Sequence, residues 1–232
     1  MKKKLLLKLA YMATIVSTLA LVSLGSWAVT VFSETAGYPR ERCVIIDPGH
    51  GGADGGAVSC TGEKESRINL EIGLRINDLL RFLGYRTKMI RSEDVSVHTK
   101  GETLSQQKMY DLRERVRICN ETEGAVLLSI HQNTFPDGRY SGAQVFYAVG
   151  NESESLAKLL QKELIRTLNP GSKREIKSSD GIYLMENIHC PGVLIECGFL
   201  SNATEEAKLR SEEYQKALAC VIASCAAEFL AE

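Results

Sequence analysis

Three side chains that can bind a metal ion or transfer protons stand at the ends of segments with strand-like sequences. His50 comes just after a short β-branched run that stops at a Pro-Gly pair, and His131 follows the apolar segment 125–130. Glu196 lies near the end of the apolar segment 192–197. In open α/β sheets, ligands bind in the crevice beyond the carboxyl ends of the strands. We therefore expect these three side chains to converge on one crevice.

Glycines flank His50 on both sides, in the segment Pro48-Gly-His-Gly-Gly52. Because glycine lacks a Cβ atom, this segment can take unusual backbone angles and let an imidazole turn toward an ion. A phosphate-binding loop fits less well, since the spacing Gly-x-Gly-x-x-Asp matches neither the dinucleotide fingerprint nor the Walker pattern. Taken alone, the segment would also suit a glycine-rich turn that carries a solvated histidine. The two other strand ends favour a metal ligand.

Glu65 is a fourth candidate, at the start of a segment with helical periodicity, 66–83. A carboxylate there is stabilised by the helix dipole, so a purely structural charge is the alternative. Two imidazoles and one carboxylate leave an open position on a tetrahedral zinc ion, as in sites where a bound water becomes a nucleophile. A free Glu196 could then accept a proton from that water and return it to a leaving amine. This set of residues predicts hydrolysis of an amide or an ester.

Segments of strand length alternate with segments of helical periodicity along most of the chain. The order strand, helix, strand within 44–90 indicates a right-handed parallel crossover. We expect a three-layer α/β fold, a mostly parallel sheet flanked by helices, that forms one catalytic domain over 43–232. The polar segment 91–107 should be a surface loop at the rim of the site. The predicted strands are 44–46, 85–90, 125–130, 143–148 and 192–197, and the predicted helices are 66–83, 108–120, 152–168 and two within 204–230.

The N-terminus has the pattern of a segment that engages a membrane. Lysines fill positions 2–4, and after Lys8 no charged residue occurs before Glu34. A run of this length can span the hydrocarbon core, for which about 20 residues suffice, and the preceding lysines favour a cytoplasmic N-terminus. We assign 1–33 to a signal or membrane-anchor segment, followed by a short polar linker, 34–42. Ser26-Trp-Ala28 would suit signal cleavage, but the apolar run continues past it, which favours an uncleaved anchor.

The charge balance argues against nucleic acid as a partner. Lys and Arg number 28 against 29 Asp and Glu, so the chain has no overall basic field. Seven cysteines are scattered without a C-x-x-C pair, and we interpret most of them as small buried apolar residues. Cys197 should point to the opposite face of its strand from Glu196, so a thiol nucleophile is not expected there.

Two further histidines lie outside the predicted site. His98 stands in a polar loop, where we expect it to be exposed. His189 is close in sequence to Glu196, which would allow a contact with substrate, but a structural role is favoured.

Five motifs occur in an order that resembles the zinc-dependent N-acetylmuramoyl-L-alanine amidases of bacterial cell walls. They span almost all of 43–232 and are specific in combination. The motifs are Val44-Ile-Ile-Asp-Pro-Gly-His-Gly-Gly, Glu65-Ser-Arg-Ile-Asn-Leu, Asp111-Leu-Arg-Glu-Arg-Val, Ser129-Ile-His-Gln-Asn and Pro191-Gly-Val-Leu-Ile-Glu-Cys-Gly-Phe-Leu-Ser-Asn202. The segment Ser141-Gly-Ala-Gln-Val-Phe-Tyr147 and the residues from Ile188 to Gly198 are most similar to the short spore-cortex branch of that family.

The resemblance implies a role for each candidate residue. The zinc ligands of the family correspond to His50, Glu65 and His131. Its catalytic glutamate corresponds to Glu196. The resemblance favours Glu65 over Glu63, because the family's glutamate stands immediately before the x-x-Ile-Asn-Leu turn. Arg115 and Asn120 match recurrent helix positions for which we expect structural roles.

The resemblance also implies the reaction, which is cleavage of the amide bond between N-acetylmuramic acid and the L-alanine of the stem peptide. Zn²⁺ would be the cofactor and peptidoglycan the substrate, in maturation of the spore cortex. The enzyme would lie on the wall side of the membrane, either anchored or secreted. The resemblance is also compatible with an activating protein partner. The departures from the family are modest: Gln132 where small residues are common and Gly192 where alanine is common.

Two other functions remain open from the residues. A zinc peptidase would cut within the stem peptide instead of at its first amide bond. A membrane-tethered wall-binding protein would have no catalysis, and the presence of all four site residues argues against it.

Overall fold

The structure is a computed structural model that describes residues 42–98 and 100–231. The predicted segment 1–33, its cleavage site and most of the linker 34–42 lie outside these residues. In chain order the helices and strands are β1 (Cys43–Pro48), α2 (Glu65–Phe82), β2 (Arg86–Met89), α3 (Leu104–Glu121), β3 (Ala125–Asn133), β4 (Gln144–Tyr147), α4 (Ser153–Thr167), β5 (Lys177–Ser178), α5 (Tyr183–Asn187), β6 (Gly192–Phe199), α6 (Ala203–Leu209) and α7 (Glu212–Ala231).

A six-stranded sheet lies at the centre of the domain, with the strand order β2-β1-β3-β6-β4-β5. The four strands β2, β1, β3 and β6 are parallel to one another. β4 runs antiparallel to β6 and parallel to β5. The predicted class, α/β with a mostly parallel sheet, is therefore confirmed.

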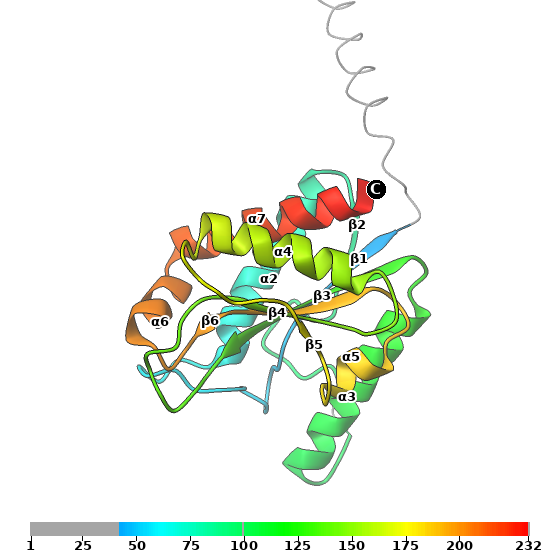
Figure 1. Ribbon diagram of the computed structural model, residues 1–232. Helices are drawn as coiled ribbons and strands as arrows, with labels where there is room; N and C mark the ends of the chain where they lie inside the picture. Colours follow the sequence, from blue (N-terminus) through cyan, green and yellow to red (C-terminus); the bar gives the residue numbers. More distant parts are fainter. Residues whose placement is uncertain (1–41, 99, 232) are drawn as a thin grey trace, which may run out of the picture. The chain divides into compact units, whose positions relative to one another are not determined.

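Helices cover both faces of this sheet (Figure 1). On one face, α7 packs against both α2 and α4, and on the other face α3 packs against α5. α6 follows β6 and contacts both that strand and α7. The arrangement has the three layers that the sequence predicts.

The central strands are buried on both faces because their residues are apolar at successive positions, as is usual for parallel strands covered by helices. Every residue of β1 is buried, and so are the first six residues of β3. By contrast, β2 alternates exposed and half-buried residues at the edge of the sheet. The strand order places the carboxyl ends of the parallel strands β1, β3 and β6 side by side in the middle of the sheet.

The last helix, α7, is long and apolar enough to cross a membrane by length and composition alone. In the described part of the chain, however, half of its most apolar window is buried inside the domain, against α2 and α4. Its buried side chains include Leu218, Ile222 and Phe229. We therefore interpret α7 as a core helix.

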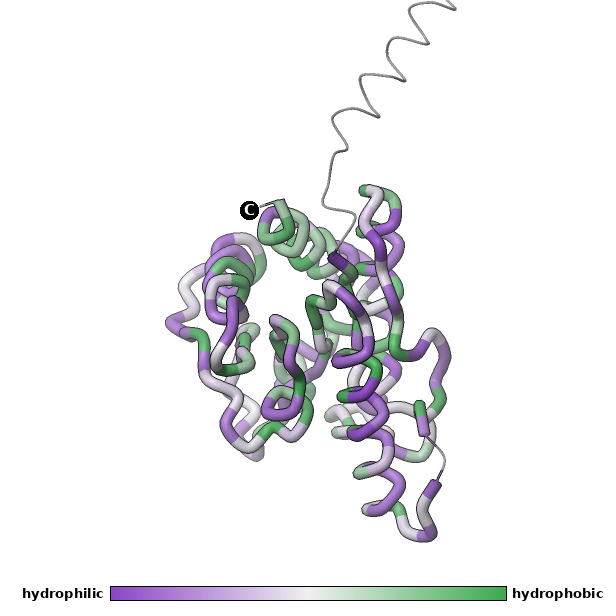
Figure 2. Tube along the Cα trace, turned by 90° about the vertical axis from the view of Figure 1, so that its right-hand side faces the viewer, coloured by the Kyte–Doolittle hydropathy of each residue, from purple (hydrophilic) through white to green (hydrophobic). Residues whose placement is uncertain are grey.

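Helix α3 begins at Leu104, four residues before the predicted start, within the segment that we expected to be a loop. A capping box causes the difference: the Thr103 side chain accepts from the backbone of Gln106, whose side chain accepts from the backbone of Thr103. Only Arg115 and Cys119 of this helix are buried. In Figure 2, α3 is the lowest helix and is hydrophilic along most of its length.

Two short elements have no counterpart among the predicted ones. β5 has two residues and α5 has five, so neither is long enough to show a period in the sequence. α5 nevertheless packs against β6 and places Leu184 and Met185 in the core. It forms part of the wall of the cavity described below.

Candidate active site

His50 is presented by a strained loop just past β1. Its backbone has φ of +61°, a left-handed conformation that is uncommon for residues other than glycine and that clusters at functional sites. The preceding residue must be glycine, because a Cβ atom on Gly49 would lie 2.2 Å from Cε1 and Nε2 of His131. The two imidazoles can approach each other only across this missing side chain, and their ring centroids are 5.0 Å apart.

Two buried arginines hold the backbone of this loop in place. Arg91 donates to the carbonyl oxygens of Pro48 at 2.8 Å and Gly49 at 3.0 Å. Arg115 donates from α3 to the carbonyl oxygen of His50 at 2.7 Å. Its guanidinium also pairs with the buried Asp47 carboxylate at the end of β1. Since both arginines donate hydrogen bonds to carbonyl oxygens of this loop, they fix the position from which His50 projects.

Glu65, the first residue of α2, lies between the two histidines. Its Oε1 is 3.0 Å from Nδ1 of His131, and its Oε2 is 3.3 Å from Nε2 of His50. Backbone N–H groups of Ala57 and Gln132 also donate to this carboxylate. Burial alone would raise the pKa of Glu65, but its hydrogen bonds and the charges of the two histidines hold that pKa well below its usual range. Glu65 is therefore ionised at neutral pH.

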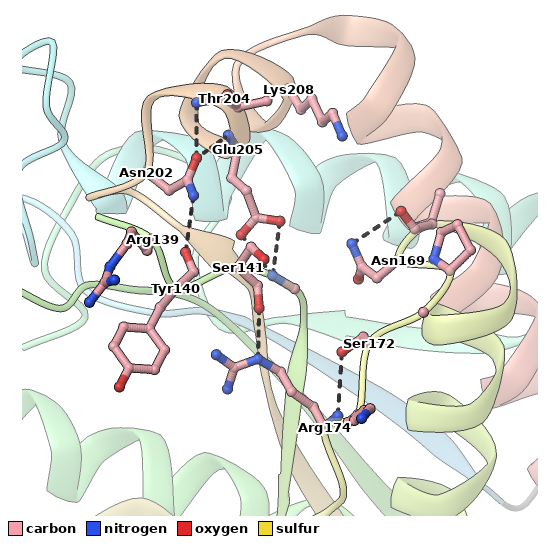
Figure 3. A pocket seen from close by; sticks show the side chains of 15 residues that line it. Arg139, Tyr140, Ser141, Asn169, Ser172, Arg174, Asn202, Thr204, Glu205 and Lys208 are labelled. Atoms are coloured by element: carbon pink, nitrogen blue, oxygen red, sulfur yellow. Dashed lines mark hydrogen bonds between the residues drawn. The ribbon is translucent and has the colours of Figure 1, made fainter. Parts of the chain in front are cut away.

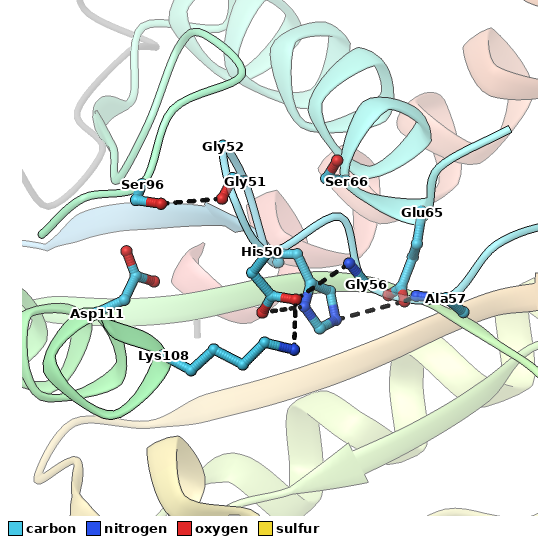
Figure 4. A network of polar contacts seen from close by, with 12 residues as sticks. His50, Gly51, Gly52, Gly56, Ala57, Glu65, Ser66, Ser96, Lys108 and Asp111 are labelled. Carbon is cyan, nitrogen blue, oxygen red and sulfur yellow. Dashed lines mark hydrogen bonds and ion pairs between the residues drawn. The ribbon is translucent and has the colours of Figure 1, made fainter. Parts of the chain in front are cut away.

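Asp54 supports His50 from the other side. One carboxylate oxygen lies 2.8 Å from Nδ1 of His50, and the other lies 2.7 Å from Nζ of Lys108 on α3. Burial opposes protonation of the imidazole, but the hydrogen bonds to Asp54 and Glu65 outweigh it and raise the pKa of His50 to about 9. Figure 4 shows the His50 ring between Lys108 and Glu65. Carboxylate contacts of this kind orient a ligating histidine and select its tautomer.

The sequence-predicted ligands thus meet. One ligand atom each from His50, Glu65 and His131 lies within 4.8 Å of the others. Two nitrogens and one carboxylate oxygen are ligands that zinc accepts, and three protein ligands leave a tetrahedral position for water. The chemistry and spacing of these donors therefore fit a catalytic zinc ion.

Glu196 lies on β6 directly opposite His131 of β3 in the strand register. Among the described residues, its buried Oε2 has no hydrogen-bond partner. Burial raises the pKa of Glu196 to about 7, while the charge of His131 acts in the opposite direction. A carboxyl group with such a pKa can both accept and donate a proton near neutral pH.

Cys197, the next residue, cannot act as a nucleophile. It is fully buried, and burial raises the pKa of its thiol far above the ordinary value. Its Sγ instead contacts the carbonyl oxygen of Ile195 at 3.7 Å.

Residues 44–227 match the family model described as N-acetylmuramoyl-L-alanine amidase. The chain belongs to this family. It is 42% identical over 185 residues to the germination-specific N-acetylmuramoyl-L-alanine amidase of Bacillus subtilis, a match that covers 78% of this chain and 76% of that protein.

Two solved structures extend the comparison. The CwlD amidase from Clostridioides difficile, solved in complex with the GerS lipoprotein, has a TM-score of 0.78 and 36% identity, covering 82% of this chain and 98% of that one. An N-acetylmuramoyl-L-alanine amidase from Clostridium difficile 630 has a TM-score of 0.71 and 27% identity, covering 82% and 97%. The resemblance to the spore-cortex branch of these amidases is confirmed.

In this amidase, His50 and His131 open into a cavity of about 410 Å³. Lys108 and Leu112 of α3 form one wall, and the segment 181–184 at the start of α5 forms another. Sequence reasoning missed Asp54 as a partner of His50, although it closes the glycine-rich loop, and it missed Lys108, Arg91 and α5 altogether. Of these, only Asp54 has a signal in the sequence, which is its position four residues after His50.

A larger cavity of about 950 Å³ lies elsewhere on the amidase and contains none of the four predicted site residues. It is lined by the loops 139–142 and 168–174 and by α6. Arg174 and Lys208 lie at opposite sides of it in Figure 3.

The two remaining histidines do not join the site in the described structure. The His98 ring stacks on Tyr110 with a centroid distance of 5.3 Å. His189 donates its backbone N–H to the side chain of Asn120 at 2.8 Å, while the amide of Asn120 donates to the carbonyl oxygen of Asn187. Asn120 thus has a structural contact, as expected.

Proposed function

We propose that this amidase hydrolyses the amide bond between N-acetylmuramic acid and the L-alanine of the peptidoglycan stem peptide. The observation that carries the proposal is the convergence of three ligand atoms within 4.8 Å, with Glu196 directly opposite His131 on the neighbouring strand. In this proposal, His50, Glu65 and His131 hold a zinc ion and Glu196 transfers protons. Family membership supports the choice of substrate.

A bound zinc ion would polarise the scissile carbonyl and lower the pKa of a water molecule toward about 7. Glu196 would accept the proton of the attacking water at Oε2, the oxygen that has no other partner. The same carboxyl group would then deliver that proton to the nitrogen of L-alanine as the C–N bond breaks. Asp54 would keep the imidazole of His50 turned toward the reacting centre throughout.

Mass spectrometry of digested cell wall tests this function. An amidase releases intact stem peptides that begin with L-alanine and leaves bare muramic acid on the glycan. A zinc peptidase would release shortened peptides and leave L-alanine on the glycan. Detection of shortened peptides would therefore contradict the amidase function and support a zinc peptidase.

We also propose that the substrate is spore-cortex peptidoglycan and that a protein partner activates the enzyme. The support is similarity to a germination-specific amidase and to a CwlD amidase solved in complex with a lipoprotein. Deletion of the gene for this amidase in a sporulating host should abolish muramic lactam in the cortex and leave the vegetative wall unchanged. Full activity of the purified chain alone on cortex fragments would contradict the need for a partner.

For location, we propose the wall side of the membrane, with 1–33 as an anchor. The uncharged run that follows Lys8 supports this. Full-length protein should sediment with membranes, whereas a chain that starts at Glu34 should stay soluble and keep its fold. Recovery of a processed N-terminus near Thr30 would indicate a cleaved signal instead.

A further inference from the structure

Cys119 and Cys190 are brought together by a fixed contact between α3 and the segment that leads into β6. Cys119 lies in the last turns of α3, and its neighbour Asn120 donates to the carbonyl oxygen of Asn187 at 3.0 Å and accepts from the N–H of His189 at 2.8 Å. These two hydrogen bonds hold the backbone on both sides of Ile188. Cys190 follows directly and packs against the apolar cluster that contains Cys119.

The two thiols differ in exposure and in acidity. Cys119 is 1% exposed, whereas Cys190 is half-buried, and both are free thiols in this structure. A hydrogen bond between the side chains raises the pKa of Cys119 and lowers the pKa of Cys190, although burial opposes the latter shift. Cys190 is therefore the thiol that ionises first and that reagents can reach. Thiolate character and access are the two conditions for thiol–disulfide exchange.

We propose that Cys119 and Cys190 form a disulfide bond when the protein meets a low-molecular-weight disulfide on the wall side of the membrane. The Cys190 thiolate attacks that disulfide, forms a mixed disulfide and releases one small thiol. Cys119 then loses its proton and attacks the sulfur of Cys190, which releases the second small thiol. Two protein thiols lose two electrons and two protons in total, and the small disulfide gains them.

The bond would join two elements that support the site. Arg115, which holds the carbonyl of His50, lies one helical turn before Cys119. Glu196 lies six residues after Cys190, on the strand that this segment enters. The bond would close a loop of about 70 residues. A cross-link of this kind stabilises the folded domain chiefly because it restricts the conformations of the unfolded chain. The inference does not depend on the reaction that the enzyme catalyses.

The test uses the full chain, equilibrated with a mixture of reduced and oxidised glutathione and then alkylated and digested without reductant. Mass spectrometry should find the peptides of Cys119 and Cys190 linked, with two hydrogens lost and neither thiol alkylated. Adding reductant should lower the thermal midpoint by about 5–15 °C. The variants Cys119→Ala and Cys190→Ala should lack both the linked peptide and this shift.

The matched control is Cys225→Ala, at a buried thiol on α7 far along the chain from this pair. It should keep both the link and the response to reductant. Should Cys119→Ala fail to fold, Cys190→Ala tests the same bond from the more exposed side. Alkylation of both thiols after equilibration, or a link between other cysteines in their place, would overturn the proposal.

Discussion

The carboxylate of Asp54 lies 2.8 Å from Nδ1 of His50, and this contact leaves Nε2 of the same ring facing Glu65. Sequence spacing places His50 in the site, but the side chain that orients it comes from the far end of its own loop. Lys108 then ties Asp54 to α3. The proposed zinc site therefore depends on a carboxylate that would not itself bind the ion.

Replacing Asp54 by alanine should weaken zinc binding about 10- to 100-fold, the usual effect of losing the partner of a ligating histidine. The reason is that the His50 ring is then free to rotate and to change tautomer. Competition with a chelator of known affinity measures the change. Asp137→Ala, which removes a carboxylate paired with Arg139 in a surface loop, is the matched control and should bind zinc like the wild type. Equal affinity in both variants would show that Asp54 does not orient the ligand.

Glu196→Gln should abolish hydrolysis while zinc content and folding stay nearly unchanged. The amide is close in size to the carboxylate but cannot accept the proton, and general acid–base catalysis contributes about 10² to 10⁴-fold. Amide cleavage on purified wall and metal analysis are measured on the same sample. Glu163→Gln serves as control, because this half-buried carboxylate on α4 pairs with Arg166 and lies outside the site. Loss of zinc from Glu196→Gln would mean that Glu196 is a ligand, and Glu65 would become the better choice for the base.

Arg115→Met should lower the free energy of unfolding by about 3–5 kcal/mol, because it leaves the Asp47 carboxylate buried without its partner. The carbonyl oxygens of Pro48 and His50 would lose a donor as well. Urea denaturation followed by circular dichroism measures the loss. Arg117→Met, two residues along the same helix, removes an exposed arginine that pairs with Glu114 and Glu121 of that helix. A similar midpoint for the two variants would contradict the structural role assigned to Arg115.

Much of this site could be predicted because it follows from how parallel sheets are built. The apolar runs before His50 and His131, and around Glu196, have the composition of strands buried on both faces, and their carboxyl ends must lie side by side. The position of Glu65 could be inferred in the same way, since it begins the helix that follows β1. In these cases local sequence determines both the element and the place of the residue on it.

The parts that could not be predicted depend on long side chains or on very short elements. Arg91 was placed in a surface loop, yet its guanidinium donates to four backbone carbonyl oxygens and is almost fully buried. Lys108 reaches Asp54 from the largely exposed N-terminal part of α3, and nothing in its sequence neighbourhood distinguishes it from a solvated lysine. α5 has too few residues to show a period. Such contacts are set by tertiary packing, which periodicity does not record.

Gly49→Ala should reduce zinc affinity by at least about tenfold, because the added methyl group would displace the proposed ligand His131. Gly49 itself is not a proposed ligand. A Cβ atom at this position would lie 2.2 Å from the ring, a separation that atoms do not tolerate, and the neighbouring backbone is held by Arg91 and Arg115. The ring must therefore swing away, and its ligand atom leaves the group that it forms with His50 and Glu65. Chelator competition measures the affinity.

The control is Gly84→Ala, at the glycine that follows α2. Its φ is +88° and an added Cβ would meet no atom within 4 Å, so the cost should be roughly 1 kcal/mol of fold stability with zinc binding unchanged. The pair separates a backbone effect from displacement of the histidine. If Gly49→Ala bound zinc as tightly as Gly84→Ala does, His131 would have to bind the ion from a position other than the one that this loop allows, and the proposed ligand set would be wrong.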